Sequence, residues 1–499
     1  MSMLSTVATL RAIQTGRAQP LTTVRHQHVD ARPFVLVPLT LAGEACAPLA
    51  ALVGTDPERP ILLTVRQPRD RVLRFRFVEE LAALLLPYIA GCLDETETYT
   101  TGKGKGAQER ECALRAPQLL VPNGEGIAYV RRLGRLTRLR TTEGPHAVHP
   151  DVPTLGKWLT WLANQAEFPG SSTLLAVSRM LTAHWATGQS STEDSHLAAV
   201  VAWIDPPEGS SGAVAARETE NPLVCPPAGP ATDAGFDVVL DDLLTRYAEA
   251  DGRVRERLGE RIDSALREQL RPTWDLVWRG AGLVRALPEG NHVEERWTYD
   301  RRWFSDYAVY LEEHGHPQGK RDRAVGAARR LARLEDAVSR YQTERAFDDP
   351  LVMAEYELTG EAFTGTVVAR DGDRFVPGGK SPRWRPVITV RSEHPVRLTV
   401  GAEVRSPARP LQKAEIIDVT PYDGTHLVAL QLAGGFASKR KPPAPPGTLA
   451  EVGEKVTYTV LGVGSVLAKL PAEEDTPWTH GGPPPPYEPT GEDAEEEWA

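Results

Sequence analysis

The pattern of apolar and polar positions changes twice along this chain of 499 residues. Before residue 206, short apolar runs with β propensity alternate with stretches of helical spacing. From residue 236 to 350 the spacing is helical throughout, and after Asp349-Pro350 the apolar period drops from 3.6 to 2. The pattern therefore predicts a mixed first region, a helical middle region and a β-rich last region.

The first region carries both kinds of pattern. The runs PFVLVPLTLAG (33–43) and ILLTVR (61–66) predict strands, and the N-terminal residues predict a short amphipathic helix. Helical spacing recurs over 75–90, 127–140, 154–167, 173–187 and 196–204. Residues 206–235 are rich in proline and glycine, so we expect a linker there and place the first domain boundary at it.

The middle region contains two long helical patterns. The first is an apolar stripe with one residue every four positions: Val254, Leu258, Ile262, Leu266 and Leu270. Pro272 follows this stripe and is expected to end the helix. Four tryptophans at 274, 278, 297 and 303 predict a dense aromatic core, so we expect a helix bundle.

The second pattern lies between Arg321 and Tyr341. Its apolar residues share one arc: Ala324, Ala327, Leu331, Leu334 and Val338. Arg329, Arg333 and Arg340 lie within about 40° of one another on a different arc, at 100° per residue. We expect the apolar arc to pack against the bundle and the arginines to face solvent.

The last region has period 2. Trp384, Ile388 and Val390 point to one side of a strand, and Arg385 and Arg391 point to the other. Further strands are expected at 363–370, 396–400, 413–419, 425–432 and 454–461. Short strands separated by Gly, Pro and Asp turns predict a small barrel of the oligonucleotide-binding or SH3-like kind.

The expected fold class is a multidomain α+β chain in five parts. They are a mixed α/β N-terminal domain (1–205), a Pro/Gly-rich linker (206–235), a helical domain (236–350), a small β-barrel domain (351–465) and an acidic Pro-rich tail (466–499). The tail has almost no apolar surface to bury, so we expect it to be disordered.

Charge is distributed unevenly along the chain. The formal net charge is -10, and residues 471–499 hold nine acidic residues without any Lys or Arg. The rest of the chain is therefore close to neutral, yet it concentrates basic residues in places. A basic cluster on a near-neutral body is typical of a surface that contacts phosphates.

The strongest candidate for such a surface is the barrel. Its basic residues are Lys380, Arg383, Arg385, Arg391, Arg397, Lys439, Arg440 and Lys441. The arginines at 329, 333 and 340, and those on the helix at 131–138, extend the same hypothesis. The alternative is a solvated strand face whose cations resist edge-to-edge aggregation, beside helix surfaces held by salt bridges.

Other motifs point to no chemistry. TTGKGKG (100–106) departs from a phosphate loop, because Glu97 stands in place of the first glycine and Gly104 in place of Ser or Thr. The histidines of HQH, HAVH and HGH sit beside Pro and Gly, so no metal or cofactor is predicted. In QSSTEDSH, we expect Ser191 to cap a helix and Asp194 to bond back to it.

The four cysteines show no CxxC pair, which favours a reducing cytoplasm, and no apolar run is long enough to span a membrane. A composition rich in Arg, Ala, Pro and Gly resembles that of GC-rich bacteria. The tail segment PPPPY favours polyproline II recognition. Its acidic residues suit partner recruitment or folding back onto the chain's own basic barrel, and the alternative is a tail that only aids solubility.

Three functional hypotheses follow. The first is a non-catalytic nucleic-acid-associated accessory subunit, which binds DNA or RNA through the barrel and works with a partner enzyme in a helicase-linked or anti-phage assembly. The second is an enzyme that assembles His146, His149, His184 and Asp194 in its N-terminal domain. The third is an interaction scaffold without affinity for polyanions. No catalytic motif is present, so we expect a chain that is not an enzyme.

Overall fold

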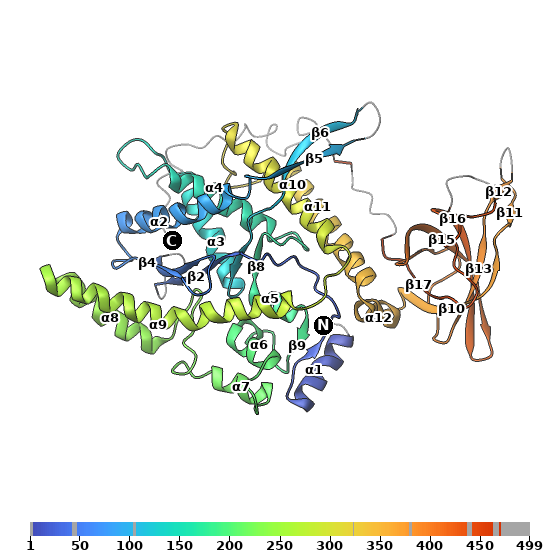
Figure 1. Ribbon diagram of the computed structural model, residues 1–499, viewed down its shortest axis with the longest axis horizontal. Helices are drawn as coiled ribbons and strands as arrows, with labels where there is room; N and C mark the ends of the chain where they lie inside the picture. The colour runs from blue at the N-terminus through green and yellow to red at the C-terminus, as the bar shows by residue number, and fades with distance from the viewer. Residues whose placement is uncertain are drawn as a thin grey trace.

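The computed structural model describes residues 3–41, 47–102, 106–322, 324–378, 382–436, 442–462 and 469–470. It is a mixed α+β structure with a closed barrel in the C-terminal region (Figure 1). The acidic tail predicted from the sequence lies almost entirely outside the described residues. No helix in the described part of the chain combines the length and apolarity needed to cross a membrane.

A five-stranded sheet in the order β4-β3-β2-β7-β8 organises the larger part of the molecule. Its strands are β2 (Phe34–Thr40), β3 (Pro48–Gly54), β4 (Ile61–Thr64), β7 (Leu119–Val121) and β8 (Leu174–Ala176). The first three form an antiparallel meander, and β7 and β8 run parallel to β2. Most strand residues are buried on both faces, which explains their continuous apolar runs.

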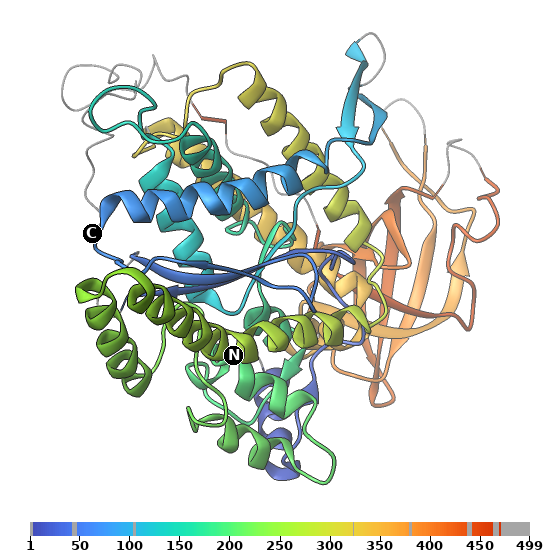
Figure 2. The same ribbon diagram turned by 60° about the vertical axis from the view of Figure 1, so that its left-hand side comes forward.

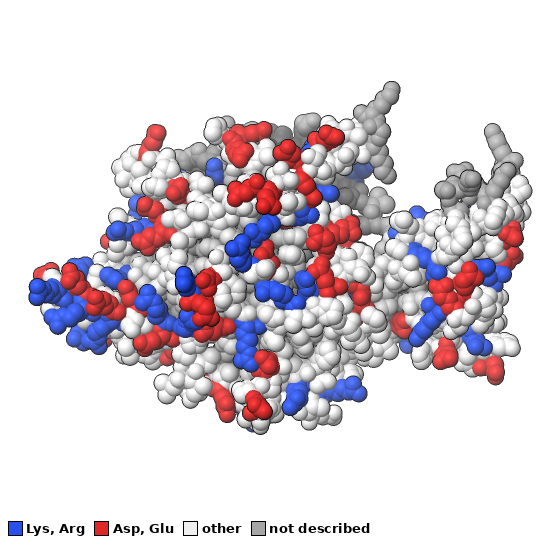
Figure 3. All heavy atoms as spheres, in the orientation of Figure 1, with Lys and Arg blue, Asp and Glu red and all other residues white. Residues whose placement is uncertain are grey.

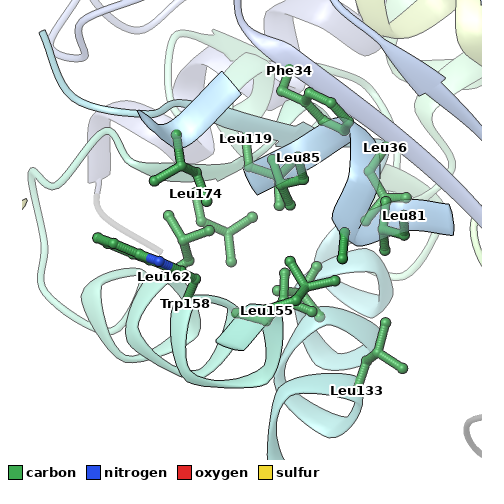
Figure 4. Close-up of a cluster of buried hydrophobic side chains, with 14 of the residues drawn as sticks. Phe34, Leu36, Leu81, Leu85, Leu119, Leu133, Leu155, Trp158, Leu162 and Leu174 are labelled. Carbon is green, nitrogen blue, oxygen red and sulfur yellow. The ribbon is translucent and has the colours of Figure 1, made fainter. Parts of the chain in front are cut away.

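One face of the sheet is covered by four helices. They are α2 (Arg71–Ala90), α3 (Gly124–Thr137), α4 (Asp151–Gln165) and α10 (Val293–Glu312). Figure 4 shows the centre of this core, where Leu155 and Leu162 of α4 meet Leu119 of β7 and Leu174 of β8.

The other face packs against α5 (Val177–Thr182) and α9 (Gly252–Arg285), and α6 (Leu197–Ile204) and α8 (Ala234–Glu249) pack against these helices, so the sheet lies between two helical layers (Figure 2). Residues on both sides of the segment 206–235 thus share the cores of one sheet. That segment itself contains a helix, α7 (Gly212–Thr219).

The helix α9 does not end at Pro272, so the expected stop there is wrong. The next turns bury Trp274, Val277 and Ala281 against the sheet, and the Trp274 indole donates to the Pro57 carbonyl at 2.8 Å. An internal proline costs a helix about 3 kcal/mol. Burial of an aromatic and several aliphatic side chains offsets that cost.

The apolar arc of the helix α11 (Ala324–Asp348) was also expected to pack, and this is wrong. Leu331 and Val338 are 58% and 39% exposed, whereas Val325, Ala337 and Ala346 are buried. The helix instead turns toward α10 the face that carries Tyr341 and Glu344, because both side chains contact Arg296 of α10. The helix α12 (Pro350–Thr359) follows, capped by Asp349, which accepts from the Leu351 amide at 2.9 Å.

Smaller elements surround the sheet. A hairpin of β5 (Thr96–Thr101) and β6 (Gln108–Ala113) includes part of TTGKGKG, whose residues 103–105 lie outside the described residues. The stretch 173–187, expected to be one helix, divides into β8, α5 and β9 (Trp185–Ala186). The strand β9 pairs with β1 (Gln19–Pro20), which follows the N-terminal helix α1 (Met3–Thr15).

The closed barrel has the strand order β10-β13-β16-β15-β14-β17. Its strands are β10 (Ala362–Asp371), β13 (Val387–Ser392), β14 (Glu403–Ser406), β15 (Arg409–Tyr422), β16 (Thr425–Gly434) and β17 (Lys455–Thr459). A small hairpin, β11 (Phe375–Val376) with β12 (Arg383–Trp384), extends from it. Trp384, Ile388 and Val390 are buried in the barrel core, which confirms the predicted inward alternation.

The strand expected at 396–400 is wrong, and β14 takes its place at 403–406. Val396 and Leu398 do pack against the barrel core, which accounts for the alternating pattern. Pro395 has no backbone N–H, so this segment lacks one of the hydrogen-bond donors that a strand would need. The Ala402 amide bonds locally to the Thr399 carbonyl, so the chain forms a turn before it enters the ladder.

Candidate binding groove

A groove of about 680 Å³ lies between α4, α10 and α11. Five aromatic side chains line it: Trp161, Phe168, Trp303, Tyr307 and Tyr310. Arg330, Arg333 and Arg340 of α11 line the opposite wall with Asp336, while Asp306 of α10 lines the groove from the aromatic side. Two of the three arginines predicted on one arc of this helix therefore face the groove; Arg329 is exposed on the same helix without lining it.

Helical spacing puts these side chains on one face of each helix. Trp303, Tyr307 and Tyr310 follow the i, i+4, i+7 spacing of α10, so all three project to the same side. Arg333 and Arg340 are seven residues apart on α11, two turns along the same face. The two rows line opposite walls of the groove, and buried Ala337 of α11 lines it as well.

The aromatic side chains form two packed groups, one of Trp161, Tyr307 and Tyr310 and one of Phe168 and Trp303. The rings of Trp161 and Tyr307 are stacked, with centroids 5.6 Å apart and planes 9° apart. Tyr310 stacks on Tyr307 at 6.0 Å, and Phe168 packs edge-on against Trp303 at 5.4 Å. Tyr307 is fixed by a hydrogen bond of 2.7 Å from the Gln318 amide to its hydroxyl. Flat, pre-ordered rings are suited to stacking against a planar or proline-rich ligand.

The cations of the groove differ in their availability. Arg330 is held by Glu167 at 2.6 Å, and the same carboxylate also binds Arg131 of α3 at 3.0 Å. Arg333 and Arg340 are exposed and form no ion pair among the described residues, although the Arg340 guanidinium lies 5.1 Å from the Tyr299 ring centroid. These two cations at the edge of the groove are therefore placed to meet an anionic ligand.

A buried polar network supports the groove from below. Arg296 donates to Glu344 at 2.6 Å and to the His26 carbonyl at 2.9 Å. Asp300 is buried and accepts from the Ser172 amide at 2.7 Å, and burial raises the pKa of its carboxyl to about 7. These bonds join α10 to α11, to the segment before β2 and to the segment before β8.

The histidines near this network have structural roles. His184 bonds through Nδ1 to the Met180 carbonyl at 2.7 Å, and its Nε2 accepts from the His26 amide at 3.2 Å. Burial lowers the pKa of His184 to about 4, and likewise that of His28, which stacks on Trp297. Both imidazoles are neutral at physiological pH, and both nitrogens of His184 are committed to the backbone.

The residues of the enzyme hypothesis have separate partners. Asp194 accepts from the Thr187 hydroxyl at 2.6 Å, and exposed His149 lies 3.5 Å from Asp151. The two ring nitrogens of His184 bond elsewhere, so the expected approach of His184 to Asp194 does not involve a hydrogen bond between them. No cluster of His, Cys, Asp or Glu suited to a metal ion occurs within the described ranges.

The expected capping box is displaced by one residue. The Ser190 hydroxyl accepts from the Glu193 amide at 3.3 Å, and the Glu193 carboxylate accepts from the Ser190 amide at 2.7 Å. This reciprocal pair precedes a short 3-10 helix at Glu193–Ser195, so the expected roles of Ser191 and Asp194 are wrong. The physical reason is the side-chain length at the third position: glutamate reaches back where aspartate does not.

The barrel arginines predicted to contact phosphates belong to different elements of the barrel. Arg391 is exposed on β13, where its ladder neighbours are Thr366 and Leu427. Arg383 is exposed on β12. Lys380, Lys439, Arg440 and Lys441 lie outside the described residues.

Two other arginines of that set are engaged locally. Arg385 donates to the Trp384 carbonyl at 3.2 Å, and Arg397 extends from the 393–402 segment to the Leu358 carbonyl of α12 at 3.4 Å. On the face seen in Figure 3, basic and acidic residues are interspersed over the barrel. Arg138, predicted on a basic helix face, is buried and donates to the Gln318 carbonyl at 2.7 Å.

No family model matches this chain. Neither a curated protein nor a solved structure matches it significantly. The geometry of the groove and barrel therefore carries the functional argument alone. The arginine arc of α11 was visible in the sequence, whereas the aromatic wall was not singled out; its signal is the i, i+4, i+7 spacing of Trp303, Tyr307 and Tyr310.

Proposed function

We propose that this chain is a non-catalytic accessory protein that holds single-stranded nucleic acid in the groove between α4, α10 and α11. The observation that carries the proposal is that Arg333 and Arg340 lie beside five aromatic side chains in one groove. Base stacking on an aromatic side chain contributes about 1–3 kcal/mol per base, and neighbouring arginines pair with the backbone. Such a site tolerates sequence variation, because every base presents a π face.

The barrel supplies a second contact in this proposal. We assign it to the oligonucleotide-binding or SH3-like kind, with exposed Arg383 and Arg391 meeting phosphates. The protein would act in a bacterial cytoplasm with a partner enzyme that provides catalysis. Phosphate contacts carry no base information, so either DNA or RNA satisfies the site.

Fluorescence anisotropy with labelled single-stranded DNA and RNA at about 50 and 200 mM salt tests the proposal. The groove variants are Arg333→Ala/Arg340→Ala and Tyr310→Leu, since Tyr310 is 43% exposed and its loss leaves the core intact. We expect the tyrosine variant to bind at least about fivefold more weakly, because 1 kcal/mol corresponds to roughly that factor. The double arginine variant should also reduce the salt dependence.

Matched controls separate the groove from other surfaces. Arg217→Ala removes an exposed arginine of α7, and Tyr422→Leu removes a tyrosine of the barrel that is 58% exposed. Both controls should bind as the unmodified chain does. Loss of binding only in Arg385→Ala/Arg391→Ala/Arg397→Ala would move the site to the barrel. Flat signals for every protein would overturn nucleic-acid binding and favour a scaffold.

A further inference from the structure

The chain leaves the barrel beside the aromatic groove. After β17, the Val460 amide donates to the Glu361 carbonyl at 3.0 Å, and Gly462 then reaches α11, where a Cβ added to it would lie 3.0 Å from Thr343 Cγ2. Gly462 lines a pocket of about 450 Å³ together with Arg340 and His292. The end of the barrel thus lies against the helix that forms one wall of the groove.

Arg340 connects the two cavities. It lines the pocket that contains Gly462 and also the groove that contains Trp303 and Tyr310. Asp336, one turn earlier on α11, lines both as well. A segment that continues from Gly462 therefore needs only to follow α11 past Arg340 to enter the groove.

The sequence after Gly462 contains the residue types that suit an aromatic groove edged by arginines: prolines, a tyrosine and carboxylates. It contains Pro483, Pro484, Pro485 and Pro486 followed by Tyr487, and acidic residues on both sides of this run. Proline-rich segments in polyproline II form dock into aromatic-lined grooves, because the preformed helix loses little entropy. The carboxylates complement the guanidinium groups of Arg333 and Arg340 at the edge of the groove.

We propose that the chain's own C-terminal segment docks in this groove, with Pro483–Tyr487 on the aromatic wall and neighbouring carboxylates near Arg333 and Arg340. The connection is long enough: the roughly twenty residues between Gly462 and Pro483 span up to about 65 Å when extended. The groove wall from Arg340 to Arg330 covers about ten residues of α11, about 15 Å. A tethered segment has an effective concentration in the millimolar range, so weak contacts suffice.

The docked segment competes with any ligand of the groove. On the proposed function, that ligand is single-stranded nucleic acid, and the segment would limit binding until a partner displaces it. The competition rests on the proposed function, whereas the docking itself does not.

The test uses the full chain and a variant in which Pro483–Tyr487 is replaced by Gly and Ser residues. A labelled peptide of residues 471–499 is titrated into each protein by anisotropy. We expect the peptide to bind the variant at least about fivefold more tightly than the unmodified chain, whose groove is occupied. Adding Arg333→Ala/Arg340→Ala to the variant should weaken peptide binding, while Arg217→Ala should not. Equal binding to both proteins, or none to either, would overturn the docking.

Oligonucleotide binding distinguishes this inference from the proposed function. If both hold, the Gly/Ser variant binds single strands more tightly than the unmodified chain. If the peptide binds in the groove and no oligonucleotide binds any variant, docking stands and nucleic-acid binding fails. If oligonucleotides bind both proteins equally and the peptide binds neither, the groove takes nucleic acid and the docking is wrong.

Discussion

Arg296 of α10 and Glu344 of α11 form an ion pair of 2.6 Å whose side chains are only 8% and 10% exposed. The same guanidinium donates to the His26 carbonyl, so one side chain joins two helices and the segment that leads to β2. The pair lies under the groove, next to the small cavity lined by Phe168 and Trp303. The position of α11 relative to α10 therefore depends on a buried charge pair as well as on packing.

Loss of one partner of this pair should destabilise the fold strongly. Arg296→Ala leaves the Glu344 carboxylate buried without its cation, which typically costs about 3–5 kcal/mol. Urea unfolding should show that decrease in the free energy of unfolding. Arg333→Ala, an exposed arginine on α11, should change it by no more than about 0.5 kcal/mol. Similar values for the two variants would show that the pair contributes little.

Asp300 should make stability depend on pH in a defined direction. Its pKa is about 7 in the folded chain, against about 3.9 when unfolded, because burial disfavours the carboxylate. Between these values the folded state retains a proton that the unfolded state releases. The stabilising contribution of Asp300 is therefore complete below about pH 4 and falls as pH rises towards 7, by at most about 1.4 kcal/mol per unit.

Asp300→Asn isolates this effect. Asparagine does not titrate, so the stability of the variant lacks this dependence on pH. The free energy of unfolding of the variant minus that of the unmodified chain should therefore increase from about pH 4.5 to 7 and then stay constant. The neighbouring buried histidines titrate in both proteins and largely cancel in the difference. Urea unfolding at several pH values provides the measurement, and a difference that does not change with pH would contradict the prediction.

Closure of the barrel depends on close approach at Gly365 of β10. A Cβ at this position would lie 2.4 Å from the Arg391 carbonyl oxygen of β13. Gly365→Ala should therefore lower the free energy of unfolding by about 1–3 kcal/mol through forced backbone shifts. Thermal unfolding provides the measurement. Gly434→Ala, in β16, should leave the free energy of unfolding unchanged, because a Cβ there would meet nothing within 4 Å among the described residues. Equal decreases in the free energy of unfolding for the two variants would refute the steric explanation.

The exposed apolar arc of α11 should tolerate polar residues. Leu331 is 58% exposed, so Leu331→Gln should change the free energy of unfolding by no more than about 0.5 kcal/mol. Ala337 is buried beside the small cavity lined by Phe168 and Trp303, and Ala337→Gln should destabilise by about 1–3 kcal/mol through overpacking. If Leu331→Gln destabilised the chain more than Ala337→Gln in chemical denaturation, the apolar arc predicted from the sequence would be the buried side of α11.

Several elements were predictable because local patterns were enough to define them. The barrel strands β10, β13, β15, β16 and β17 were expected near their observed positions, since period-2 alternation reports one buried face. The helices α3, α4 and α6 were likewise expected from their spacing. In contrast, β3, β7 and β8 were not, because short apolar runs buried on both faces have no period.

Part of the candidate site was also predictable. The shared arc of Arg329, Arg333 and Arg340 follows from 100° per residue, whatever the helix packs against. Which side of that helix is buried does not follow, because Leu331 and Val338 form the more apolar arc and yet remain exposed. The ion pair between Glu344 and Arg296 turns the other side of α11 toward α10, and the sequence of α11 alone does not reveal that contact.

The sequence by itself determined the periods: helices in the middle of the chain, a barrel after residue 360, and the arginines that share a face of α11. Only the tertiary structure decided the assembly. It carried α9 through Pro272 because the sheet buries Trp274, and it brought Trp161, Tyr307 and Arg340 to one groove from three helices. Periodicity records which side of one element is apolar, whereas a binding site depends on distances between elements far apart in sequence, and those distances are set by packing.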